Sequence, residues 1–200
     1  MTLRSLAAVA LLAGLMLPAP AFADTSLTAY EAARSALLAI WAELPLTARN
    51  VTLTDGLAKG YCNYTVHEGN SYKIGEQINV YVEVLGYGFK DNGDGTLSQL
   101  LDADLSLIDA NGTTVASQAK FLSANIVSRT KLLETYLTLD ATLTSFAPGD
   151  YKLQYALRDL AGNKQTTFEV PITLTPADAP PSDASSSEPP PDASSSSAAQ

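Results

Sequence analysis

The spacing of apolar residues changes once along the chain, at Pro45. Upstream, apolar side chains between residues 30 and 44 recur every three or four positions, which places them on one face of an α-helix. Thr28 and Glu31 have the spacing of a capping box, and Pro45 fits the end of the helix. We therefore expect an N-terminal amphipathic helix within residues 24–48.

The apolar stripe of this helix needs a surface to cover it. It can dock on the sheet of its own domain, or it can lie in the groove of a partner protein. The pattern leaves both possibilities open. The stripe consists of Tyr30, Ala33, Leu37, Ile40, Trp41 and Leu44.

Downstream of Pro45 the period becomes two, which is typical of half-buried β-strands. In residues 76–86, four aliphatic side chains alternate with Asn79, Tyr81 and Glu83, which we expect on the polar face. Pro171 has no backbone donor and indicates an edge position. Six or seven such strands, with turns about every ten residues, predict an antiparallel sandwich or barrel. The other alternating runs cover 49–55, 100–117 with a hairpin at Asn111-Gly112, 132–143, 151–159 and 166–175.

Two stretches resemble bacterial immunoglobulin-like domains. Residues 146–174 have a Pro-Gly turn, a strand that begins with Tyr151 and then a D-x-x-G-N loop, and residues 72–84 have the K-x-G-E turn and strand. The resemblance implies an immunoglobulin-like β-sandwich of about seven strands over residues 49–175. It also implies that the Tyr151 hydroxyl bonds back to the preceding loop. The Cys–Trp–Cys core of that family is absent, and the family does not specify a function.

Both ends of the chain have distinctive compositions. Residues 1–23 combine Arg4, an apolar run and Ala21-Phe22-Ala23, as a secretory signal peptide cleaved before Asp24 does. The apolar run is too short to span a bilayer. Residues 176–200 contain Pro, Ser, Ala and acidic residues without large apolar side chains, which predicts a disordered tail. We expect a periplasmic or secreted protein of bacterial type.

Charge narrows the choice of partner. The chain has 12 Lys and Arg against 21 Asp and Glu, and removal of Arg4 with the signal peptide changes the net charge from −9 to −10. Such a surface repels phosphate backbones and anionic lipid. We therefore expect no nucleic-acid partner and no membrane span, and a protein partner in the cell envelope or a polysaccharide instead.

The residue types that perform chemistry are sparse. Cys62 cannot form an internal disulfide, because it is the single cysteine, so it is either buried and inert or a route to a covalent dimer. Within one strand, Cys62 and His67 would lie about 16 Å apart on opposite faces, which excludes a nucleophile–base pair. No zinc motif, nucleophile elbow or phosphate loop occurs. The sequence predicts no catalytic residue, no metal ligand and no cofactor.

The stretch 88–100 contains Asp91 and Asp94 in a glycine-rich loop that is similar to a calcium-binding loop. Neither register of an EF-hand fits, since Lys90 or a glycine occupies ligand positions. We interpret the loop as a hairpin connection, because Asn-Gly and Asp-Gly pairs form turns. An irregular calcium site remains a second hypothesis.

Aromatic residues crowd into the region from residue 61 to 89, and Tyr81 lies on the expected polar face. Exposed rings could stack on sugars or anchor a protein, whereas cross-strand pairs would only stiffen the sheet. The sequence thus favours an exported, non-catalytic module for protein interaction. The alternatives are a carbohydrate-binding module and a structural spacer. The candidate ligand-binding residues are Tyr64, Tyr72, Tyr81, Tyr87 and Phe89.

Overall fold

A computed structural model describes residues 22–177. The described chain forms two units, an N-terminal helix and a β-sheet unit that begins at Leu44. Most of the predicted signal peptide and tail lies outside the described residues. Their predicted roles are therefore untested.

The helical unit consists of α1, Phe22–Glu43. The helix ends at Glu43, before Pro45, because proline has no backbone donor with which to continue a helix. It begins earlier than expected, and the capping role of Thr28 is wrong. Because the backbone is already helical at Phe22, the amide of Thr28 has an intrahelical acceptor four residues upstream. Tyr30 and Ile40 of the apolar stripe are exposed.

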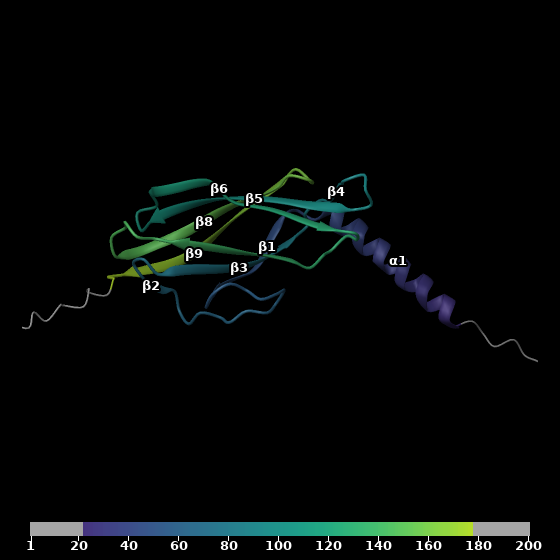
Figure 1. Ribbon diagram of the computed structural model, residues 1–200, viewed down its shortest axis with the longest axis horizontal. Helices are drawn as coiled ribbons and strands as arrows, with labels where there is room; N and C mark the ends of the chain where they lie inside the picture. Colours follow the sequence, from purple (N-terminus) through teal and green to yellow (C-terminus); the bar gives the residue numbers. More distant parts are fainter. Residues whose placement is uncertain (1–21, 178–200) are drawn as a thin grey trace, which may run out of the picture. The chain divides into compact units, whose positions relative to one another are not determined.

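The second unit is a β-sandwich of two sheets (Figure 1). Neighbouring strands are antiparallel, except that β2 pairs with β9 in parallel. The smaller sheet has the order β1-β3-β7 and the larger one the order β2-β9-β8-β5, with β4 and β6 both paired to β5. The strands are β1 Thr47–Thr54, β2 Ser71–Lys73, β3 Gln77–Leu85, β4 Lys90–Asp91, β5 Leu97–Asp109, β6 Thr114–Ser128, β7 Thr135–Thr142, β8 Gly149–Asp159 and β9 Lys164–Thr175.

The predicted fold class is confirmed: the chain is mainly β, with antiparallel sheets preceded by one helix. The described residues form nine strands rather than about seven. The two additional strands, β2 and β4, have only three and two residues. Such short strands leave no measurable alternation in a sequence.

Alternation correctly identified the side chains between the sheets. Val80 and Val82 of the smaller sheet and Leu101 and Leu153 of the larger sheet are all fully buried. The Asn111-Gly112 turn joins β5 to β6, and Gly112 has φ +81°. Pro171 pairs with Lys152 of β8, while β2 reaches only residues 173–175 of β9. On its other side, β9 therefore has no strand partner at Pro171 among the described residues, as the missing backbone donor of proline predicted.

Two sets of contacts fix the loops at the two ends of β8. The Tyr151 hydroxyl donates to the Ala147 carbonyl at 2.9 Å, which confirms the predicted bond to the preceding loop. Asp159 is buried and accepts backbone N–H groups of Gly88 and Gly162 at 2.7 and 3.0 Å. A Cβ on Gly88 would lie 2.6 Å from the Gly162 nitrogen, so this approach requires glycine.

Candidate functional site

The outer face of β3 is covered, although its residues are polar. The loop 55–70 crosses it and is tied to β1, since the His67 amide donates to the Leu53 carbonyl at 2.9 Å. The expectation that β3 is half-buried is therefore wrong. From Ile78 to Val84 every residue of the strand is buried, because aromatic and hydrogen-bonding side chains of the loop replace solvent.

A carboxylate at the centre of this cover, Glu83, accepts hydrogen bonds from residues of β1 and of the covering loop. Arg49 of β1 contacts Oε2 through Nε at 2.9 Å and through a terminal nitrogen at 2.6 Å. Asn50 donates to Oε1 at 3.0 Å, and the Tyr61 hydroxyl donates to Oε2 at 3.1 Å. The Cys62 thiol lies 3.4 Å from Oε1. We call these five residues the Glu83 centre.

Electrostatics keeps this carboxylate ionised. The Glu83 side chain is 1% exposed, and burial alone would raise its pKa. Hydrogen bonds from Asn50 and Arg49 outweigh that effect and lower the pKa of Glu83 to about 2. The centre therefore holds a satisfied anion that fastens the loop to the sheet.

Cys62 belongs to this centre but lacks the features of a nucleophile. The residue is exposed, so the expected burial of the thiol is wrong. Its backbone has φ +56°, and its amide donates to the Tyr81 hydroxyl at 3.0 Å. Desolvation of the sulfur and the adjacent Glu83 carboxylate raise the pKa of the Cys62 thiol. A raised pKa disfavours the reactive thiolate.

His67 has a different partner. Its Nδ1 lies 2.6 Å from Asp55 Oδ1, and its ring stacks on Tyr72 with centroids 4.5 Å apart. Cys62 instead contacts Glu83. The two residues thus have separate partners, and the geometry lacks the nucleophile–base contact that covalent catalysis uses.

The predicted tyrosine face does not form. Tyr72, Tyr81 and Tyr87 are buried, so the expected exposure of Tyr81 is wrong. Tyr64, from the covering loop, packs on Tyr81 with centroids 4.2 Å apart. Phe89 is half-buried and meets Tyr87 edge-on at 5.5 Å. Four of the five rings thus form two pairs, and Tyr72 stacks on His67, so each of the five has an aromatic neighbour inside the domain.

The loop after β4 is a hairpin connection, as predicted. Lys90 and Asp91 of β4 pair with the start of β5. Asp91 accepts the Gly93 amide at 2.8 Å, and Asp94 accepts the Thr96 amide at 2.9 Å. Both carboxylates therefore cap turn amides. Calcium binding by this loop remains untested.

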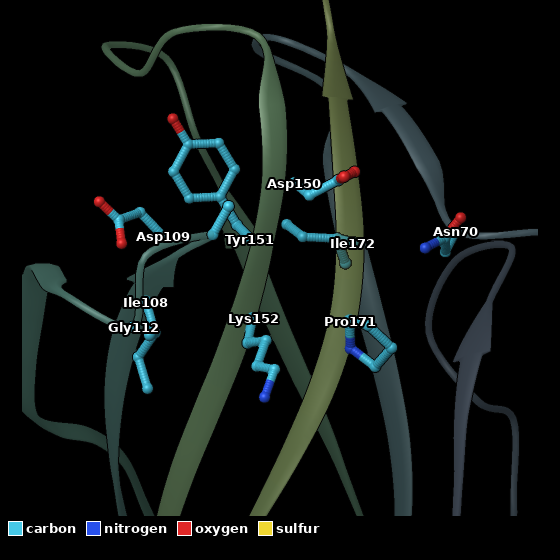
Figure 2. A pocket seen from close by; sticks show the side chains of 10 residues that line it. Asn70, Ile108, Asp109, Gly112, Asp150, Tyr151, Lys152, Pro171 and Ile172 are labelled. Atoms are coloured by element: carbon cyan, nitrogen blue, oxygen red, sulfur yellow. The ribbon is translucent and has the colours of Figure 1, made fainter.

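An open groove of ≈ 410 Å³ lies at one end of the larger sheet. Figure 2 shows that the carboxylates of Asp109 and Asp150 in its lining point away from each other. Each is already bonded, since Asp109 accepts the Thr113 amide at 2.8 Å and Asp150 accepts the Thr173 hydroxyl at 2.7 Å. Lys152 pairs with Glu169 at 2.9 Å. The groove therefore lacks a converging set of free polar groups.

The larger sheet has a long free strand edge at β6. Within residues 22–177, β6 pairs with β5 alone and β7 pairs with β3 alone. A second groove of ≈ 300 Å³ lies between them and is mainly apolar, with Asp140 as its one charged lining residue. Its apolar walls come from β5, β6, β7, β8 and the segment after β7: Leu105, Leu107, Ala116, Phe121, Ala141, Leu143, Phe146 and Leu153.

The sequence pattern predicted only the first part of β6. Alternation predicted the strand only as far as residue 117, whereas it continues to Ser128. The missed half begins at a bulge, where Lys120 has φ +50° and the register with β5 shifts. A bulge shifts the side-chain period by one residue. The alternating Leu122, Ala124 and Ile126 beyond it were the available signal.

Two further observations concern the described residues. In that part of the chain, no three His, Cys, Asp or Glu side chains come together in an arrangement able to hold a metal ion. Its helix is also not apolar enough over a sufficient length to cross a membrane.

Comparisons with known proteins give weak likenesses. No family model matches the chain, and no curated protein matches it. One solved structure, the alkylpurine DNA glycosylase AlkC of Pseudomonas fluorescens bound to DNA containing an abasic site analog, aligns at 11% identity with a TM-score of 0.37. The alignment covers 77% of this chain and 40% of the glycosylase, so the chain spans less than half of that protein.

Two other structures are similar at the same level. CopC of Methylosinus trichosporium OB3b aligns at 17% identity with a TM-score of 0.31, covering 65% of this chain and 98% of CopC. A family 123 glycoside hydrolase of Clostridium perfringens aligns at 13% identity with a TM-score of 0.35, covering 68% and 28%. At these scores the likenesses say nothing about activity.

Proposed function

We propose that the mature chain is an exported, non-catalytic module of immunoglobulin-like fold that binds another protein in the cell envelope. The export rests on the signal sequence in residues 1–23. The fold is supported by the strand order, in which β1-β3-β7 corresponds to strands A-B-E and β9-β8-β5 to strands G-F-C of such domains. The hydroxyl bond of Tyr151 to Ala147 is the tyrosine corner of the same class.

The free edge of β6 is the observation that carries the binding role. It presents 15 residues of strand, with Val115 and Val127 exposed. A long edge with exposed apolar side chains is a surface on which another chain can add. A catalytic role has less support, because Cys62 and His67, the residues most typical of a nucleophile and a base, have separate partners.

The buried tyrosines distinguish the alternatives. A carbohydrate site needs exposed rings, and Tyr72, Tyr81 and Tyr87 are buried. The same burial favours a structural spacer as the second candidate. A spacer would contact no partner through its sheets.

Photo-crosslinking in intact cells tests the binding role. A photoreactive residue would replace Val127 on β6 or Gln165 on β9, each in the full-length protein. We expect a discrete protein adduct from at least one position. Recovery of the free monomer from both positions would contradict the proposal and favour the spacer.

A further inference from the structure

The regular part of β6 lies beyond its bulge. From Leu122 to Ser128 the strand pairs without interruption with residues 97–103 of β5. Protein strands usually have about 5–6 residues, so this half is a complete strand length. It contains no proline, and its one exposed edge is unpaired within the described chain. Two devices that block an edge, short length and proline, are absent from residues 122–128, and the bulge at Lys120 lies before this stretch.

The same stretch has an uncovered apolar face. Leu122 pairs with Ala103, which is fully buried, yet Leu122 itself is only half-buried. Ala124 and Ile126, on the same face, are half-buried as well. The larger sheet is wider than the three-stranded sheet opposite, so β6 projects past the core. An added strand with alternating apolar side chains would extend this face.

The positive charge near β6 indicates which kind of partner strand would bind there. Residues 113–133 contain Lys120, Arg129 and Lys131 and no carboxylate, in a chain of net charge −9. Neither Arg129 nor Lys131 has a salt-bridge partner among the described residues, and Lys131 lies over the Phe89 ring at 5.8 Å.

Two carboxylates of β5, the strand that pairs with β6, already have partners. Asp104 is bound by Arg158 through a terminal nitrogen at 2.8 Å, and Asp102 accepts the Ser123 hydroxyl at 2.8 Å. The cations at the end of β6 are thus available to an incoming carboxylate.

From this geometry we infer that the edge at residues 122–128 takes an extended segment of a partner protein in which carboxylates alternate with apolar residues. This inference rests on the proposed binding role and names its partner. A second copy fits worse, because two paired β6 edges would bring six cations together. The tail of this chain also fits worse, since residues 176–200 contain six prolines and no large apolar side chain.

Fluorescence polarisation with a labelled eight-residue peptide of alternating Glu and Val tests the inference on the mature protein. We expect binding of this peptide and none of the matched Lys–Val peptide. The double variant Arg129→Glu, Lys131→Glu should weaken binding by about tenfold or more, because it replaces attraction with repulsion. Lys59→Glu, a charge reversal in the exposed part of the covering loop, is the control and should leave binding unchanged.

Proline at two consecutive positions tests strand addition itself. Adjacent amides of a strand point to opposite edges, so one of Ala124→Pro and Asn125→Pro removes a donor from the free edge and the other breaks the pairing with β5. The variant that keeps the wild-type melting temperature should no longer bind the Glu–Val peptide. Unchanged binding by that variant would overturn the inference.

Three other outcomes would also overturn it: equal binding of both peptides, displacement of the acidic peptide by a peptide of residues 176–200, and self-association in sedimentation that Arg129→Glu abolishes. A crosslinked partner at Gln165 together with any of these outcomes would preserve the proposed function. Absence of every crosslinked partner would remove the proposed function itself.

Discussion

Replacement of Glu83 by glutamine tests the role of the Glu83 centre directly. The change keeps the shape of the side chain but removes the charge that Arg49 contacts at 2.6 Å. One pKa unit corresponds to about 1.4 kcal/mol, so a pKa lowered from 4.5 to about 2 corresponds to about 3 kcal/mol. Loss of one partner of a buried pair costs about 3–5 kcal/mol, and the exposure of Arg49 favours the lower end. We expect Glu83→Gln to lower the free energy of unfolding by about 3 kcal/mol.

The same pair predicts how stability depends on pH. Folding lowers the pKa of Glu83, so its contribution is complete above the unfolded value of 4.5 and disappears as the pH falls towards 2. The variant has no carboxylate at this position. The difference in unfolding free energy between wild type and Glu83→Gln should therefore be largest above pH 5 and should shrink towards pH 2.

Urea unfolding followed by far-UV circular dichroism measures both effects. Glu169→Gln is the matched control, because Glu169 is 40% exposed and its pair with Lys152 lies on the sheet surface. Such a pair contributes about 0–1 kcal/mol. A Glu83→Gln variant no less stable than Glu169→Gln, or an unchanged difference from pH 7 to pH 2, would refute the role assigned to the centre.

Three further predictions concern single contacts. Tyr151→Phe should lower the unfolding free energy by about 1 kcal/mol in urea titrations, because it removes one hydrogen bond to Ala147; no loss would contradict the corner. Gly88→Ala should cost about 1–3 kcal/mol or more, since the new Cβ meets the Gly162 backbone; wild-type stability would show that the loops yield. Glu83→Gln should speed alkylation of Cys62 at pH 8, because the carboxylate raises the thiol pKa; an unchanged rate would contradict their contact.

Alternation in the sequence was sufficient for the inner faces of the sheets. Val80 and Val82 were expected in the core and are fully buried there, because apolar burial dominates that side of the strand. The N-terminal helix was also expected, although not its start at Phe22. Periodicity reports which residues avoid water, and both features follow from that property alone.

The burial of the outer face of β3 could not be predicted from the alternation of apolar and polar residues. Glu83 is polar, so a pattern of apolar residues places it in solvent, whereas donors from positions 49–62 bury it. Such pairing depends on how a loop folds back over a sheet, and a single sequence does not encode that as a period. The β6 edge was missed for a related reason, since the bulge at Lys120 interrupts the alternation.

Hydrogen–deuterium exchange of the mature protein, with and without the alternating acidic peptide, is the most direct test of the proposed binding edge. In the free protein, we expect slow exchange throughout β3 and fast exchange at every second amide of residues 122–128. The peptide should protect those fast amides and leave the remaining strands unchanged. Protection elsewhere, or none, would contradict strand addition at β6.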